Sequence, residues 1–158
     1  MSLNTWLANG WIVKHQATRE EIANLVALVD RDIASAALSD LPADWKLGIA
    51  YNAALQLATA ALAVSGYRPG RERHHERAIL SLRFTLGIST NRVDVIDAVR
   101  RKRNRTTYEH IGGTSDAEAS QFHDAVIALR GDFVSWLKKE HPTLCPPGLV
   151  VRTPRDHE

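Results

Sequence analysis

An arginine, an asparagine and a histidine have the types and spacing that suit chemistry on a phosphate group. Arg103 and His110 are seven positions apart, so on an α-helix they lie within about 20° of each other. Arg100, Asn104 and Thr107 share that face. A guanidinium offers a fork of donors that fits phosphate oxygens, and a histidine titrating near neutrality can transfer a proton. The group therefore suits metal-free cleavage of a phosphodiester, although an arginine and a histidine on one helix face also occur in proteins without catalysis.

A pair of adjacent histidines, His74 and His75, is a second candidate. Glu72 and His75 form a Glu-x-x-His step of the kind that binds metals in helical bundles. A dinuclear site needs a second such step and two further carboxylates, and the sequence contains no second Glu-x-x-His. We therefore expect no metal or other cofactor here. One histidine is expected to pack near the basic helix, or the pair extends a basic rim for RNA together with Arg71, Arg73 and Arg77.

Hydrophobic periodicity predicts the helices that must position these residues. Two capping boxes, which begin at Thr18 and Ser115, open amphipathic helices of residues 19–38 and 116–140. Between them we expect an alanine-rich helix from residue 45 to the stop signal at Gly66, a helix of residues 72–86 and the basic helix of residues 89–110. Residues 67–70 are expected to form a turn, and no segment has the alternation of a strand. The prediction is an all-α fold, a four- to five-helix up-and-down bundle.

The chain length of 158 residues fits a single domain. We expect an N-terminal extension of residues 1–17, whose Trp6, Trp11 and Ile12 pack a short helix on the bundle. The bundle itself spans residues 18–144, and residues 145–158 form a flexible C-terminal tail. Tyr51 and Tyr67 are expected to be ordinary bundle residues whose hydroxyls are satisfied at its edge.

Composition limits the classes of function. Lysine and arginine number 20 against 18 acidic residues, so only the local basic patches of residues 68–77 and 100–105 favour a polyanionic partner, and such a run can also be a solvated helix face. The single cysteine, Cys145, excludes an internal disulfide and a thiolate-rich zinc site. The apolar stretch of residues 53–64 is shorter than the roughly 20 residues of a membrane span, and the N-terminus lacks the pattern of a secretory signal. We expect a cytoplasmic protein without a membrane span.

Three stretches of the chain resemble a known family. They are AYNAALQLATAALAVSGYR at residues 50–68, RERHHERAI at 71–79 and RRKRNRTTYEH at 100–110. In this order they are similar to a bacterial branch of the HEPN (higher eukaryotes and prokaryotes nucleotide-binding) superfamily, whose function is poorly defined. HEPN domains are small helical bundles marked by an arginine, often followed by asparagine, and a histidine that is separated from the arginine by four to six residues. The resemblance covers residues 25–144.

The resemblance implies a homodimer in which the motif helices of two protomers form one composite site. In active HEPN members this site is a metal-independent ribonuclease. Arg103 would hold the scissile phosphate, Asn104 would orient the site, and His110 would serve as general acid or base. Family members often pair with a minimal nucleotidyltransferase that acts as an antitoxin, so the resemblance implies such a partner here.

The sequence departs from the commonest form of the motif, in which the histidine stands five residues after the arginine. That position is Tyr108, and an unperturbed tyrosine, with a pKa near 10, is a poor base at neutral pH. Two main functions stay open: an RNA endonuclease of toxin-antitoxin or defence type, and a non-catalytic nucleotide- or RNA-binding module that regulates a partner. A third possibility is a structural or interaction bundle that binds no polyanionic ligand. The residues expected to contribute to binding are Arg100, Thr107, Tyr108, His74 and His75.

Overall fold

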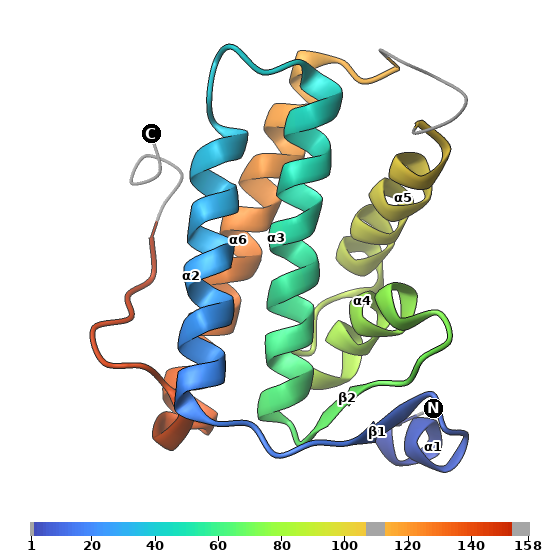
Figure 1. The fold of residues 1–158 in the computed structure, drawn as a ribbon, viewed down its shortest axis with the longest axis vertical. Helices are drawn as coiled ribbons and strands as arrows, with labels where there is room; N and C mark the ends of the chain where they lie inside the picture. Colours follow the sequence, from blue (N-terminus) through green and yellow to red (C-terminus); the bar gives the residue numbers. More distant parts are fainter. Residues whose placement is uncertain (1, 107–112, 153–158) are drawn as a thin grey trace.

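The computed structural model describes residues 2–106 and 113–152, and these are mostly helical (Figure 1). The described helices are α1 (Leu3–Ala8), α2 (Arg19–Ala36), α3 (Ala43–Val64), α4 (His74–Thr85), α5 (Thr90–Thr106) and α6 (Asp116–Glu140). Two short strands, β1 (Ile12–Lys14) and β2 (Tyr67–Pro69), and a 3-10 turn, Pro142–Leu144, complete the described elements. The prediction of a helical bundle is confirmed at this level of description.

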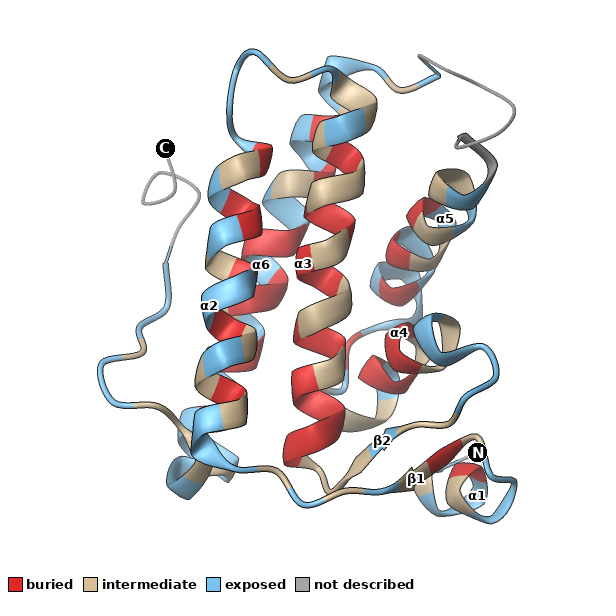
Figure 2. Cartoon of the chain, viewed as in Figure 1, coloured by how far each residue is buried: buried red, intermediate tan, exposed pale blue. Residues whose placement is uncertain are grey.

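The alanine-rich helix α3 is the centre of the bundle. It contacts α2 and α6 on one side and α4 and α5 on the other (Figure 1). Its seven alanines between positions 50 and 63 are all buried, and small side chains let neighbouring helices approach closely. Figure 2 shows buried residues along most of its length. By length and composition, α3 is the one described helix that could cross a membrane, but 67% of its most apolar window is buried inside the bundle.

Two helices begin where the sequence predicts. The Thr18 hydroxyl accepts a hydrogen bond from the backbone N–H of Glu21 at 3.1 Å, and the Ser115 hydroxyl accepts one from Glu118 at 3.0 Å. These bonds satisfy backbone donors that the first helical turn leaves without intrahelical partners. The apolar stripes of α2 and α6 are buried against α3. Helix α4 begins two residues later than predicted, at His74.

The expectation of a turn at residues 67–70, with no strand in the chain, was wrong. Residues 67–69 form β2, which pairs antiparallel with β1, so that Val13 lies opposite Arg68. Strands of three residues are too short to display alternation, and their partners are far apart in sequence. The connection from β2 to α4 begins at Gly70. A Cβ at this position would lie only 2.8 Å from the carbonyl oxygen of Gly10, so a side chain does not fit there.

The N-terminal segment packs on the bundle through a small second core. Helix α1 is the predicted short helix, and Trp6, Ile12 and Leu62 are buried together. The guanidinium of Arg77, on α4, lies 3.7 Å from the centre of the Trp11 ring, a cation–π contact. The strand pair and this contact fix the position of the segment that connects β2 to α4.

The start of the predicted flexible tail lies against α2 and α6. Arg130 on α6 has only 1% of its surface exposed. Its guanidinium donates to both carboxylate oxygens of Asp30, at 2.6 and 3.2 Å, and to the carbonyl oxygen of Val150 at 2.7 Å. The described part of the tail, residues 145–152, is thus tied to the bundle by a buried charge. Residues 153–158 lie outside the described part of the chain.

Candidate functional site

The polar end of α5 carries the candidate site, and the structure describes its side chains as far as Asn104. Thr107, Tyr108 and His110 lie outside the described residues. The predicted meeting of Arg103 and His110 on one face therefore stays a prediction. Asn104 is exposed, whereas Arg103 is half-buried, so of these two described motif residues it is the arginine that faces the bundle.

Arg103 lies along the surface of α3. Its guanidinium carbon is 5.2 Å from the centre of the Tyr51 ring, within the range of a cation–π contact. One turn earlier on α3 stands Gly48, where a Cβ would lie 3.9 Å from Nε of Arg103. The arginine thus lies over one turn of α3, between a glycine and an aromatic ring.

We expected the Tyr51 hydroxyl to have a hydrogen-bond partner at the edge of the bundle, and the structure shows otherwise. Only 1% of the residue's surface is exposed, and the hydroxyl has no hydrogen-bond partner among the described residues. Burial raises the pKa of Tyr51, against the lowering effect of Arg100 and Arg103. The side chain is therefore a neutral phenol at neutral pH, able both to donate and to accept a hydrogen bond.

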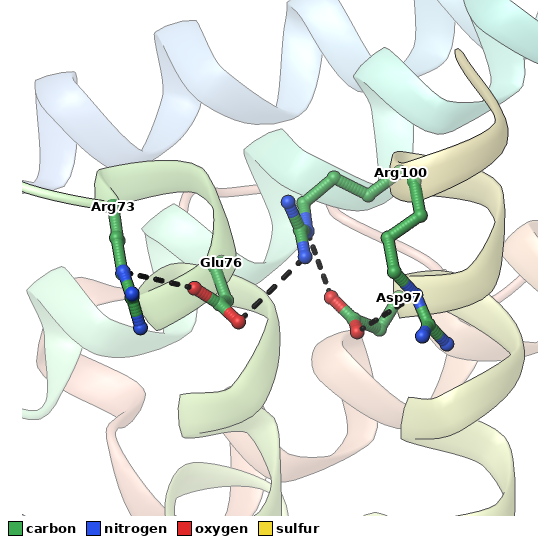
Figure 3. A network of polar contacts seen from close by, with 5 residues as sticks. Arg73, Glu76, Asp97 and Arg100 are labelled. Atoms are coloured by element: carbon green, nitrogen blue, oxygen red, sulfur yellow. Dashed lines mark hydrogen bonds and ion pairs between the residues drawn. The ribbon is translucent and has the colours of Figure 1, made fainter. Parts of the chain in front are cut away.

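Arg100 is held by acids from two helices (Figure 3). Its Nε donates to a carboxylate oxygen of Asp97 at 2.7 Å, and its Nη2 lies 3.7 Å from a carboxylate oxygen of Glu76 on α4. Arg101 and Arg73 extend this chain of ion pairs at its two ends. Partial burial would lower the pKa of Arg100, but the hydrogen bond and charge of Asp97, with Glu76, raise it overall. Arg100 therefore joins α4 to α5 as a permanent cation.

His75 lies close enough to the two arginines to feel their charge. Its pKa is lowered, first by partial burial and then by His74, Arg103 and Arg100. The His74 and His75 ring centres are 4.2 Å apart at the start of α4. The imidazole of His75 is therefore neutral at neutral pH, and because the residue is exposed, the packing of one histidine near the basic helix stays a prediction.

The other predicted members of the basic rim have separate roles. Arg77 stacks on Trp11, and Arg73 lies 3.9 Å from Glu76. Arg71 is exposed beside a cavity. No three His, Cys, Asp or Glu side chains come together as a metal site in residues 2–106 and 113–152.

The site that the structure assembles is therefore Arg103, Tyr51, Arg100 and His75, from three helices. Sequence reasoning missed Tyr51, whose signal was its place one turn after Gly48 in an alanine-rich helix. Two guanidinium groups, a hydroxyl and a neutral imidazole are suited to holding a phosphate oxygen. Comparisons with family models, with curated proteins and with solved structures found no match for this chain.

Proposed function

We propose that this chain is a HEPN-type helical domain that binds RNA by holding a backbone phosphate at the end of α5. The observation that carries the proposal is the position of the Arg103 guanidinium over the ring of Tyr51, whose hydroxyl is buried and has no hydrogen-bond partner among the described residues. The charges of Arg100 and Arg103 act both on the Tyr51 hydroxyl and on the His75 imidazole.

A buried hydroxyl without a partner is costly, by about 1–3 kcal/mol. Folded proteins leave few such groups, and those that persist call for an explanation. A phosphate oxygen is a strong acceptor and would give the Tyr51 hydroxyl its missing partner. The arginine fork would bring that oxygen to the site through charge-assisted hydrogen bonds. RNA supplies such phosphates in series, and its bases carry no part of this recognition.

Arg100 has a different role in this proposal. Its ion pair with Glu76 joins α5 to α4, and its ion pair with Asp97, on the same helix, fixes the guanidinium. The long-range field of the guanidinium still favours an anion at Arg103. Asn104, exposed on the next position of α5, would contact the ribose or the neighbouring phosphate.

The proposal includes a homodimer through α5, in a cytoplasmic protein. Val95 on α5 is 50% exposed, and it borders a groove of about 400 Å³ whose apolar lining includes Ala98, Val99 and Phe122. A second copy would cover this apolar surface and bring two phosphate sites together. Light scattering tests the α5 interface, because a Val95→Glu variant that keeps the mass of a dimer would contradict it. A minimal nucleotidyltransferase is the proposed partner of the dimer.

Binding of a fluorescein-labelled single-stranded RNA, followed by fluorescence anisotropy, tests the main proposal. Arg103→Ala should weaken binding about tenfold and reduce the dependence of log Kd on log salt by about one. Arg92→Ala is the matched control, because Arg92 lies on the same helix but pairs with Asp132, from α6. Equal affinities of the two variants would overturn the proposal.

A second candidate function is metal-independent cleavage of RNA, favoured by the sequence spacing of Arg103, Asn104 and His110, which a continuous α-helix would bring to one face. In this function Arg103 would stabilise the phosphate charge and His110 would transfer the proton. It ranks second because Tyr108 stands where the family most often has its histidine. Purified protein incubated with RNA in EDTA should then cleave it, and His110→Ala should abolish cleavage while leaving anisotropy binding intact. Absence of cleavage, or cleavage unchanged in His110→Ala, would exclude this candidate.

A further inference from the structure

A cavity of about 450 Å³ opens between α2, α3, β2 and the start of α4, on the turns of α3 that follow Tyr51. Its size falls in the range of small-molecule sites, about 300–1,000 Å³. Leu25, Leu55 and Ala78 give it apolar walls. The cavity lies beside the Arg103 site and shares one residue with it, His75, whereas Arg103, Arg100 and Tyr51 are not among its lining residues.

The mouth of the cavity is basic. Arg68, Arg71, His74 and His75 line it, and all four residues are exposed. Its lining in the described parts of the chain contains no Asp or Glu. Charge complementarity therefore favours a ligand that carries negative charge at the mouth.

The backbone holds these cations in place. Arg68 is the central residue of β2, paired with Val13, and Gly70 packs against the carbonyl oxygen of Gly10 just before Arg71. Helix α4 starts at the mouth, and in the described chain no side chain caps its first turn. The N–H groups of that turn add donors for an anion to the two guanidinium groups.

One residue of the cavity lining has a polar atom without a hydrogen-bond partner among the described residues. Gln56 lines the cavity, and its Nε2 donates to a carboxylate oxygen of buried Asp32 at 2.9 Å. This bond fixes the orientation of the amide. Its Oε1 is buried and has no partner among the described residues. A ligand with an N–H or O–H on its inner end would supply the missing hydrogen bond.

We propose that this cavity binds an aromatic phosphate monoester whose ring system carries a hydrogen-bond donor. The phosphate would lie at Arg68, Arg71 and the first turn of α4. The ring would lie against Leu25 and Leu55, with its donor toward Oε1 of Gln56. This phosphate position uses neither Arg103 nor Arg100, so the proposal does not rest on RNA binding at Arg103.

Isothermal titration calorimetry with four probes tests the proposal on the full chain. The probes are 3-indoxyl phosphate, 1-naphthyl phosphate, inorganic phosphate and indole. We expect 3-indoxyl phosphate to bind at least about tenfold more tightly than inorganic phosphate or indole, because only it uses both the mouth and the walls. 1-Naphthyl phosphate, of similar ring size but without a donor, should bind about fivefold more weakly than 3-indoxyl phosphate.

Two variants locate the binding. Arg71→Ala should weaken 3-indoxyl phosphate at least about tenfold, whereas Arg83→Ala, an exposed arginine on α4 outside the cavity lining, should leave it unchanged. Circular dichroism confirms that both variants fold. Equal affinities for 3-indoxyl phosphate and inorganic phosphate would overturn the proposal, because they would indicate surface charge alone. Equal losses in Arg71→Ala and Arg83→Ala would overturn it as well.

Discussion

Replacing Tyr51 with phenylalanine should stabilise the free protein and weaken its binding to RNA. The hydroxyl is buried and lacks a partner in the described part of the chain, and a group of this kind costs about 1–3 kcal/mol. Phenylalanine removes the hydroxyl and keeps the ring under the Arg103 guanidinium. Side-chain relaxation recovers part of the cost in the native protein. We therefore expect the free energy of unfolding to rise by about 1 kcal/mol.

Urea denaturation followed by tryptophan fluorescence measures this change, and an unchanged m value shows that the gain lies in stability alone. Tyr67→Phe is the control, because Tyr67 lies half-buried on β2 and should change stability by less than about 0.5 kcal/mol. In the anisotropy assay, Tyr51→Phe should weaken RNA binding about three- to tenfold, the loss of one hydrogen bond to a charged oxygen.

Two results would refute the reasoning. Destabilisation of Tyr51→Phe by about 1 kcal/mol or more would show that the hydroxyl has a partner in the folded protein. Stabilisation without any loss of RNA affinity would show that the orphaned hydroxyl belongs to no phosphate site. If the unsatisfied hydroxyl belongs to a binding site, the substitution raises stability and lowers affinity for RNA, so the two effects have opposite signs.

Three further changes probe the surroundings of the site and the tail. Asp97→Asn removes the charge that holds Arg100, so the free energy of unfolding should fall by about 1–3 kcal/mol in urea, and RNA affinity should rise; unchanged stability would contradict the network of Figure 3. The pKa of His75 is lowered in the folded protein. At pH values just below the usual histidine pKa of about 6.5, the unfolded chain therefore binds more protons than the folded chain. The contribution of His75 to the free energy of unfolding is therefore complete above that pH and is lost as the pH falls toward the lower pKa of the folded state. This loss should shrink in His75→Gln, and identical urea unfolding curves at pH 7.5 and 5.5 would contradict the prediction. Arg130→Met should lower the free energy of unfolding by about 3 kcal/mol, because it leaves Asp30 unpaired. The Tm should fall accordingly, and adding Asp30→Asn to the same chain should partly restore it. A change below about 1 kcal/mol would contradict a buried pair.

Local patterns in the sequence were enough for the long helices. The caps at Thr18 and Ser115 and the apolar period behind them concern neighbours three and four residues apart, whose geometry is the same in every α-helix. The alanine-rich segment that ends at the stop signal Gly66 was likewise predicted as a helix. The family resemblance, the dimer and the pairing of Arg103 with His110 stay predictions.

Contacts between helices decided the candidate site. Arg103 meets Tyr51 across 52 positions of sequence, and Glu76 meets Arg100 across 24. The pairing of β1 with β2, which places Arg68 at the mouth of the cavity, spans a similar distance. Helical periodicity determines which side chains share a face, but the register and crossing angle of α3, α4 and α5 determine what that face meets. Those quantities result from packing the whole core at once, and no short segment of the sequence contains them.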